Sequence, residues 1–166
     1  MSSEPSKEKS TDDREILEQI HFGFIHPYRV AGMGEPWVAR IRDTHQSLAA
    51  EGIGAILTLT EDDMYGHLHI AAGFRHHHEP IDDTEPPTRE GMERALGFMD
   101  ACLDRGLGVA AHCMEGRGRT GTVLCAWLGI KESLTPQQAI VRIHELRAYT
   151  VLTPSQRAFL HEYLQH

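Results

Sequence analysis

The side chains best suited to chemistry in this chain lie in one short stretch, His112 to Thr120. Cys113 offers a sulfur nucleophile, and the guanidinium of Arg119 is a planar fork that matches the oxygens of a phosphate group. Between them, Gly116 and Gly118 allow the backbone to fold closely around a ligand. An apolar run precedes the stretch and a helix-compatible run follows it, which predicts a strand, a tight loop and a helix.

This strand–loop–helix arrangement predicts an anion site. The first N–H groups of a helix have no partner within the helix, and they bind oxyanions. The same groups favour the thiolate form of Cys113 near neutral pH. Thr120 is placed to donate its hydroxyl to the sulfur, whereas His112 precedes the cysteine and is expected to face the other side of the sheet in a supporting role. A thiolate beneath a phosphate cradle predicts nucleophilic attack on phosphorus.

The pattern of His112, Cys113, five further residues, Arg119 and Thr120 resembles the signature of the cysteine-dependent protein tyrosine phosphatases. The short chain and the flanking sequences resemble the small atypical dual-specificity branch, over about residues 22–163. The resemblance implies the phosphatase fold and hydrolysis of phosphomonoesters through a cysteinyl-phosphate, without a cofactor. It also implies that the residues of the loop bind the substrate phosphate: Met114, Glu115, Gly116, Arg117 and Gly118.

A general acid is needed because an alkoxide or phenoxide leaves poorly unless it is protonated, and such catalysis contributes about 10²–10⁴ in rate. The pair Asp82-Asp83 lies upstream of the cysteine, on a predicted loop that continues to Pro86-Pro87. This segment resembles the acid loop of the family, and aligning its prolines assigns the acid to Asp83. Asp82 remains an alternative, since it stands where relatives often have proline.

Gln156 has two interpretations. The resemblance places it near the position of a glutamine that orients the hydrolytic water. Its spacing from Thr153 instead predicts the reciprocal hydrogen bonds of a helix capping box. Both remain open at the level of the sequence.

Histidine is abundant, with 12 residues, so zinc binding is a natural question. His67 and His69 alternate on a predicted strand, and three histidines follow at 76–78. No cysteine or carboxylate accompanies them at recognisable ligand spacing, so the sequence predicts no metal site. Cys102 and Cys125 occupy apolar helix positions and are predicted to be buried in the core.

Composition limits the remaining possibilities. Hydrophobic residues make up 40% and charged residues 24%, as in ordinary globular proteins. An odd number of cysteines, three, and the lack of an apolar leader predict a cytoplasmic protein. A formal net charge of −8 argues against nucleic acid as a partner. No apolar run approaches the length of a membrane span, so stable membrane association is not expected. The expected partner is a phosphorylated protein or small phosphomonoester; no feature sets the oligomeric state.

The rest of the chain predicts an α/β domain of three layers, with a small, largely parallel sheet, flanking helices and a helical C-terminal half. Residues 1–13 are predicted to form a disordered lead-in and residues 14–166 a single catalytic domain. The predicted strands are 22–25, 28–31, 53–59, 74–78 and 108–111. Helices are predicted from Pro36 to Gly52, from Thr88 to Gly106, over 120–131, and after the capping boxes at Thr135 and Thr153.

The predicted activity is hydrolysis of phosphotyrosine in proteins, with phosphoserine and phosphothreonine as further substrates, because the chain has little length for the loops that wall a deep cleft. Three alternatives remain. The first is a phosphatase of phosphoinositides or other small phosphomonoesters. The second is a module that binds phosphoproteins without turnover. The third is a sulfur-transfer enzyme of the rhodanese type, which the acid loop and the Arg119-Thr120 pair disfavour.

Overall fold

The computed structural model describes residues 11–165 of the chain. Its centre is a five-stranded sheet in the order β1-β2-β5-β3-β4. β1 pairs antiparallel with β2 at one edge, and all other pairings are parallel. The small, largely parallel sheet is therefore confirmed. The strands are β1 (Gly23–Phe24), β2 (Val30–Met33), β3 (Ile53–Thr58), β4 (Arg75–His78) and β5 (Gly108–His112).

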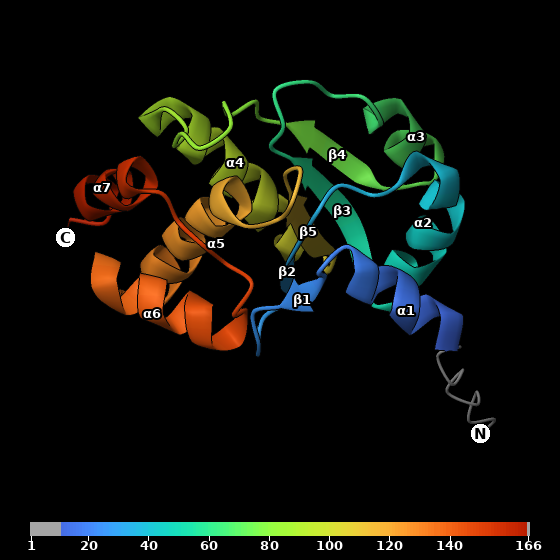
Figure 1. Ribbon diagram of the computed structural model, residues 1–166, viewed down its shortest axis with the longest axis horizontal. Helices are drawn as coiled ribbons and strands as arrows, with labels where there is room; N and C mark the ends of the chain where they lie inside the picture. The colour runs from blue at the N-terminus through green and yellow to red at the C-terminus, as the bar shows by residue number, and fades with distance from the viewer. Residues whose placement is uncertain (1–10, 166) are drawn as a thin grey trace.

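Helices cover both faces of the sheet (Figure 1). On one side lie α4 (Arg89–Asp104), α5 (Gly118–Lys131), α6 (Pro136–Leu146) and α7 (Pro154–Tyr163). On the other side lie α1 (Thr11–Gln19), the short 3₁₀ helix η1 (Val38–Arg40), α2 (Ile41–Ala50) and α3 (Gly66–Ala71). None of the described helices has both the length and the apolar character needed to span a membrane.

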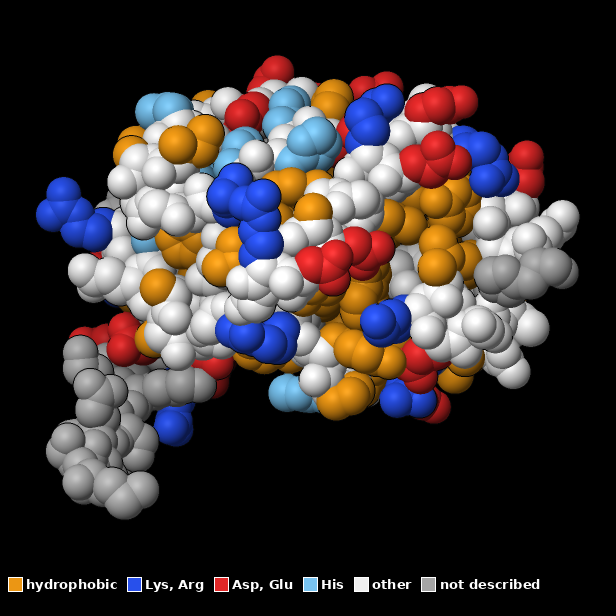
Figure 2. Space-filling view, turned by 180° about the vertical axis from the view of Figure 1, so that it is seen from behind, with side chains coloured by type: hydrophobic (Ala, Val, Ile, Leu, Met, Phe, Trp, Pro, Cys, Tyr) orange, Lys and Arg blue, Asp and Glu red, His pale blue; other side chains and the backbone are white. Residues whose placement is uncertain are grey.

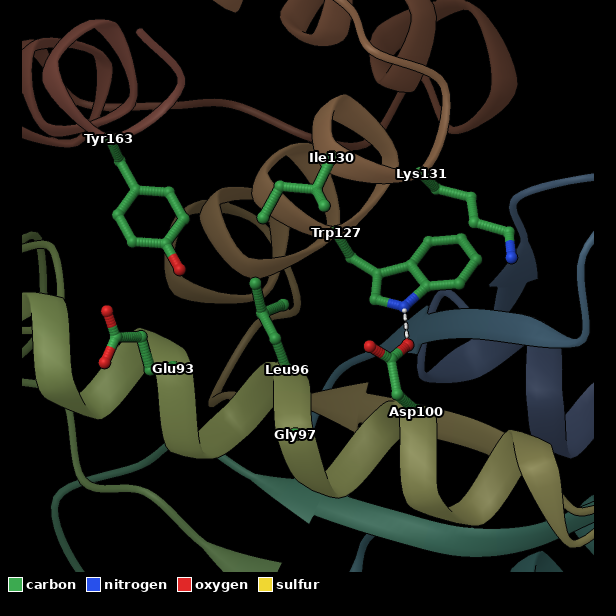
Figure 3. Close-up of a pocket in the computed structure, with 8 residues that line it drawn as sticks. All are labelled: Glu93, Leu96, Gly97, Asp100, Trp127, Ile130, Lys131 and Tyr163. Carbon is green, nitrogen blue, oxygen red and sulfur yellow. Dashed lines mark hydrogen bonds between the residues drawn. The ribbon is translucent and has the colours of Figure 1, made fainter. Parts of the chain in front are cut away.

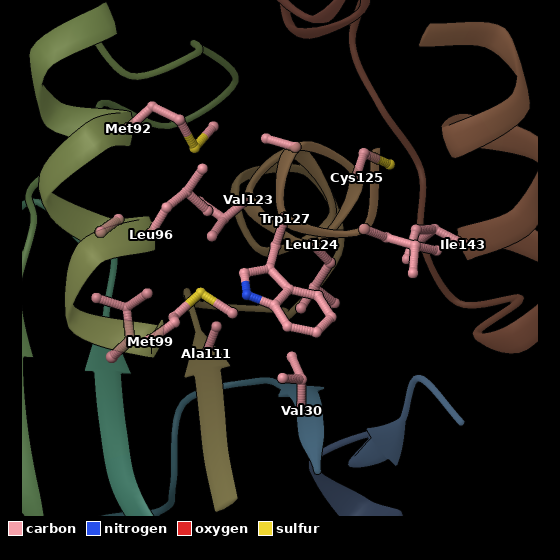
Figure 4. Packing of buried hydrophobic residues seen from close by; sticks show 14 of the residues in the cluster. Val30, Met92, Leu96, Met99, Ala111, Val123, Leu124, Cys125, Trp127 and Ile143 are labelled. Carbon is pink, nitrogen blue, oxygen red and sulfur yellow. The ribbon is translucent and has the colours of Figure 1, made fainter. Parts of the chain in front are cut away.

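Alternation along the strands divides the core into two clusters. On β3, Ala55 and Leu57 face the larger cluster while Ile56 faces the smaller one, as expected for side chains that alternate between the faces of a sheet. The larger cluster, shown in Figure 4, packs Met92, Leu96 and Met99 of α4 against α5 and the sheet. The smaller cluster joins α1 and α2 to the opposite face of the sheet. The two faces therefore present different environments at the end of β5.

Capping residues in the sequence correctly predicted where three of the described helices begin. Thr88 accepts a hydrogen bond from the amide of Gly91 and caps α4 as predicted. Both predicted capping boxes are present, with Thr135 before α6 and Thr153 before α7. α1 begins at Thr11, so residues 11–13, which were predicted to belong to the lead-in, are helical; residues 1–10 lie outside the described residues.

The prediction for α2 was wrong at its start. Pro36 is not its first residue, because η1 intervenes and α2 begins at Ile41. Val38 is 56% exposed, whereas Thr44, His45 and Ser47 are buried beside Leu48. The cause is tertiary: the smaller core accepts polar side chains that have hydrogen-bond partners on other elements, such as the hydroxyl of Ser47, which donates to the carboxylate of Asp13 on α1 at 3.0 Å.

The predicted strand around His67 and His69 is also wrong, because both residues lie on α3. The alternation of histidine with aliphatic residues imitates a strand pattern with a period of two. In the structure, however, His69 is buried and Ile70 is 62% exposed. Asp63 accepts a hydrogen bond from the amide of Gly66 at the start of the helix. Burial of a histidine in place of its aliphatic neighbour cannot be inferred from hydrophobic periodicity.

Candidate active site

The loop between β5 and α5 carries the predicted nucleophile. Cys113 follows the last residue of β5 and is only 3% exposed. The hydroxyl of Thr120 donates to its sulfur at 3.1 Å. α5 begins at Gly118, two residues before the predicted start, and its N-terminus has no side-chain cap. The first amides of α5 are therefore not engaged by a capping side chain, which suits the binding of an oxyanion.

Arg119 is almost fully buried, at 4% exposure. One of its nitrogens, Nη1, donates to the carbonyl of Ile81 at 3.0 Å and to the carboxylate of Glu61. The other, Nη2, lies 3.4 Å from the carboxylate of Asp83. The guanidinium thus joins the signature loop to two loops that are distant in the sequence.

Glu61 was not among the predicted site residues. It lies on the loop after β3, at the carboxyl end of the sheet, where α/β proteins tend to place functional residues. That position was the available signal in the sequence. A hydrogen bond from its own backbone amide and the neighbouring Arg119 hold the pKa of Glu61 below its ordinary value.

The structure separates the two candidate acids. Asp83 lines the hollow above Cys113, and its carboxylate accepts a hydrogen bond from the amide of Thr84 at 2.9 Å. Asp82 is exposed, and its backbone carbonyl closes a turn to the amide of Glu85. The carboxylate beside Arg119 is thus that of Asp83.

Gln156 is fully buried and is engaged by other groups. Its Oε1 accepts from the amide of Thr153 at 3.0 Å, which is the capping-box contact. Its Nε2 donates to the carbonyl of Glu85 at 3.2 Å, and its amide packs against the backbone of Gly118. Gln156 therefore ties the acid loop and the signature loop to the start of α7. Its predicted role in orienting water stays a prediction.

A hollow of about 260 Å³ lies above Cys113. Met114 is 55% exposed at its mouth, and the carboxylate of Glu115 turns outward to lie 3.7 Å from Nε of Arg117. The guanidinium of Arg117 stacks over the ring of Tyr149 at 4.2 Å. The lining residues are Asp83, Thr84, Cys113, Met114, Glu115, Arg117, Gly118 and Arg119.

The sharp turn of the loop depends on Gly116. Its φ is +77°, and a Cβ there would lie 2.5 Å from the backbone of Met33. The carbonyl of Gly116 accepts a hydrogen bond from Nη1 of Arg147. The other terminal nitrogen of this guanidinium, Nη2, donates to the carbonyl of His21 at 2.9 Å. Burial lowers the pKa of Arg147 to about 10. Arg147 supports the loop from below, a contact that its sequence position alone did not predict.

His112 lies on the opposite face of the sheet from the hollow. It is buried, its Nδ1 lies 3.2 Å from the carbonyl of Cys113, and its Nε2 lies 2.9 Å from the hydroxyl of Thr58. Burial lowers the pKa of His112 to about 4. The imidazole is thus uncharged at neutral pH and contacts the nucleophile only through the backbone.

A second hollow, of about 280 Å³, lies between α4, α5 and Tyr163 of α7 (Figure 3). It shares no lining residue with the hollow above Cys113. Its wall is stabilised by a hydrogen bond from the indole of Trp127 to Asp100 at 2.9 Å. The two candidate acids and the predicted phosphate-binding residues lie elsewhere.

Comparison with known proteins decides the family. The family described as "Polymorphic toxin system, DSP-PTPase phosphatase" matches residues 31–132, which is more than half of the chain. The chain belongs to this DSP-PTPase family. The matched residues include β3, β4 and β5, the predicted acid loop and the complete signature. The predicted relationship to the dual-specificity branch of the cysteine-dependent phosphatases is therefore confirmed.

Individual proteins are also similar in sequence to this DSP-PTPase chain. An uncharacterized protein of Methanocaldococcus jannaschii is 35% identical over 86 residues, covering 52% of this chain and 57% of the relative. Phosphatidylglycerophosphatase and protein-tyrosine phosphatase 1 of Rattus norvegicus is 31% identical over 83 residues, which cover 50% of this chain and 43% of that relative. The chain thus spans about half the length of these relatives.

The fold of the DSP-PTPase chain is also found in solved structures. The crystal structure of Tk-PTP in the active form superposes with a TM-score of 0.77 at 28% identity. The superposition covers 87% of this chain and 96% of Tk-PTP. This agreement confirms the predicted phosphatase fold, with its sheet between two layers of helices.

Proposed function

We propose that this chain is a phosphoprotein phosphatase that hydrolyses phosphotyrosine, and also phosphoserine and phosphothreonine, through a cysteinyl-phosphate. The observation that carries the proposal is the convergence of three side chains on one hollow: Cys113, Arg119 and Asp83. Cys113 lies on the loop after β5, Arg119 at the start of α5 and Asp83 on the loop after β4, and the three meet at the carboxyl ends of the parallel strands. A nucleophile, a binding group for the phosphate and an acid are the parts that this chemistry requires.

In the first step, the sulfur of Cys113 attacks phosphorus. The S–P bond forms as the bond from phosphorus to the leaving oxygen breaks. Asp83 supplies a proton to that oxygen, so an alcohol or phenol departs rather than its anion. Arg119 and the amides at the start of α5 stabilise the charge on the phosphoryl oxygens. The hydroxyl of Thr120, already 3.1 Å from the sulfur, stabilises the thiolate.

In the second step, water attacks the cysteinyl-phosphate. Asp83, now ionised, accepts a proton from the water, the new P–O bond forms and the S–P bond breaks. Inorganic phosphate leaves, and both the thiolate and the protonated acid are restored. Gln156 contributes by holding the acid loop through the carbonyl of Glu85.

Charge around the hollow supports a substrate with a single phosphate. Glu61 and Asp83 contact Arg119, and Glu115 is exposed at the rim. Glu35 also lies near Arg119; its burial raises the pKa of its carboxyl, and Arg119 opposes that shift. A second phosphate beside the first would face these carboxylates at a cost. A phosphoprotein therefore fits better than a polyphosphorylated lipid.

The proposed location is the cytoplasm. Cys102, Cys113 and Cys125 are all free, and a catalytic thiol needs a reducing compartment. The proposed partners are phosphorylated proteins, without nucleic acid or stable membrane association. The formal net charge of −8 supports the first exclusion.

The test is phosphate release from an aryl phosphate and from phosphotyrosyl and phosphothreonyl peptides, with phosphoinositides and nucleotides as further arms. We expect Cys113→Ser and Arg119→Lys to abolish turnover. Asp83→Asn should lower kcat by about 10²–10⁴, since it removes the general acid. Rapid quenching of that variant should trap a phosphoryl group on Cys113, detected by mass spectrometry.

Asp82→Asn is the matched control, since it removes a neighbouring carboxylate that lies outside the hollow, and it should retain nearly full activity. Full activity of Cys113→Ser would overturn the proposal. Tight binding of phosphopeptides by the wild-type chain without phosphate release would instead establish a binding module. Preference for phosphoinositides over all peptides would replace the proposed substrate class.

A further inference from the structure

A row of hydrogen bonds runs behind the signature loop, on the face of the sheet covered by α2 and α3. The carbonyl of Cys113 contacts Nδ1 of His112 at 3.2 Å. Nε2 of His112 lies 2.9 Å from the hydroxyl of Thr58, and the same hydroxyl lies 2.9 Å from Nε2 of His76. Asp63 Oδ1 stands 3.7 Å from that nitrogen and accepts from the amide of Gly66 at 3.0 Å. The row connects an acidic surface loop to the backbone of the nucleophile.

The register of the sheet brings these residues together. Thr58 and His112 are direct partners on the adjacent parallel strands β3 and β5. His76 on β4 pairs with Ile56, two residues before Thr58 and on the same face. His77 points to the other face, where it stacks against Phe98 of α4 and lies 3.3 Å from Glu79. β4 therefore carries His76, which belongs to the row, and next to it His77, which does not.

The row has one direction. A carbonyl oxygen only accepts, so Nδ1 of His112 must carry the proton and Nε2 must be the acceptor. The hydroxyl of Thr58 then donates to His112, and its oxygen accepts the N–H of His76. Each member thereby fixes the tautomer and ring orientation of the next. The hydrogen bond from Nδ1 of His112 holds the Cys113 carbonyl on the side of α2 and α3. The sulfur of Cys113, which Thr120 contacts, lies on the other face.

The surroundings of the row keep its imidazoles neutral. The ring of His69, which is hydrogen-bonded to His45 at 2.8 Å, packs against His76 and His112 with ring centroids 5.5 and 6.2 Å away. His78 is committed to the carbonyl of Thr60 at 2.7 Å. Histidine side chains also gather along the upper part of the surface in Figure 2. Within residues 11–165, no group of three or more His, Cys, Asp or Glu is arranged to hold a metal ion.

We propose that Thr58 and His76 are positioning residues for the nucleophile, acting through His112. By holding the Cys113 carbonyl dipole away from the sulfur, they stabilise the thiolate and preserve the shape of the phosphate cradle. The inference rests on the proposed function for its catalytic meaning, whereas its effect on the thiol is measured without any substrate.

The experiment is the rate of alkylation of Cys113 by iodoacetamide as a function of pH, followed by mass spectrometry of the peptide that contains it. Thr58→Val keeps the shape and removes the hydroxyl. It should raise the pH of half-maximal alkylation by about 0.5–1 unit and lower kcat by about threefold to tenfold, the size expected for one hydrogen bond. His76→Phe should produce a smaller shift in the same direction, because Thr58 can still donate to His112.

Two variants test whether the effect belongs to the hydrogen bonds. Thr58→Ser restores a hydroxyl and should return the midpoint and kcat to those of the wild type. His77→Phe changes the adjacent histidine on the other face and should leave the midpoint unchanged. Equal midpoints for the wild type, Thr58→Val and His76→Phe would overturn the inference, as would an equal shift in His77→Phe. If Thr58→Val does not fold, the comparison of His76→Phe with His77→Phe decides.

The two proposals fail in distinguishable ways. A wild-type chain that releases no phosphate from any substrate contradicts the proposed function, whatever the alkylation shows. Shifted midpoints in that chain would still support the positioning of the thiol. Normal hydrolysis with unchanged midpoints would leave the phosphatase in place and remove Thr58 and His76 from its mechanism.

Discussion

β5 ends between two different environments, and its last residues serve both. Cys113 belongs to the face covered by α4 and α5, where an open hollow gathers Arg119 and Asp83. His112, one residue earlier, enters the face covered by α2 and α3, where buried imidazoles exchange hydrogen bonds. The first environment stabilises charge and the second excludes it. A strand places neighbouring side chains on opposite faces, so the reactive group and its supporting imidazole belong to consecutive residues.

The largest effect should come from distorting the catalytic face. Gly116→Ala adds a Cβ about 2.5 Å from the backbone of Met33, at a φ of +77°. The loop must then shift, and we expect kcat/KM for an aryl phosphate to fall by about 10² or more, since a misplacement of about 1 Å has that effect. Gly97→Ala is the control, because nothing lies within 4 Å of its added Cβ on α4. An active Gly116→Ala variant would contradict the assigned geometry.

The second prediction concerns how low pH affects the stability of the fold, because buried histidines line the face of the sheet that α2 and α3 cover. Burial, the larger cause, lowers the pKa of His112 to about 4 and that of His69 to about 3, the neighbouring histidines adding to the shift. Below pH 6.5 the unfolded chain takes up protons that the folded chain refuses. Stability should therefore fall as pH decreases from about 6.5 toward 4, by up to about 1.4 kcal/mol per pH unit for each histidine.

Urea unfolding at pH 7, 6 and 5 measures this slope above the range in which carboxylates titrate. His69→Leu should reduce the slope and should leave the hydrogen bonds between Thr58 and His112 in place. A free energy of unfolding that is constant from pH 7 to pH 5 would show that the imidazole face does not exclude protons.

The smallest effect should come from the rim of the hollow. Glu61→Gln removes a charge from Arg119 while keeping a hydrogen-bond acceptor. Inorganic phosphate should then inhibit at a concentration about twofold to threefold lower, because exposed ion pairs contribute only about 0.2–1 kcal/mol. Asp62→Asn controls for the change in net charge on the same loop. Weaker inhibition by phosphate in Glu61→Gln would indicate that Glu61 positions Arg119 rather than competing with the ligand.

Prediction from the sequence succeeded where the determinants are local. The capping boxes at Thr135 and Thr153 depend on residues three apart, and both formed. It failed at α3 and at the start of α2, where burial of His69 and exposure of Val38 reverse the order of hydrophobicity. Those positions are decided by hydrogen-bond partners from other elements, which periodicity does not contain.

The sequence by itself determined the signature loop, since Cys113, Gly116, Arg119 and Thr120 lie within eight consecutive positions and the loop needs only its own turn to assemble them. Only the tertiary structure decided what holds that loop: Glu61 at Arg119, Arg147 beneath Gly116, and Thr58 behind His112. These partners are 31 to 58 positions apart in the chain. They meet because of parallel strand register and helix packing, and a hydrogen bond requires that placement to within about half an ångström.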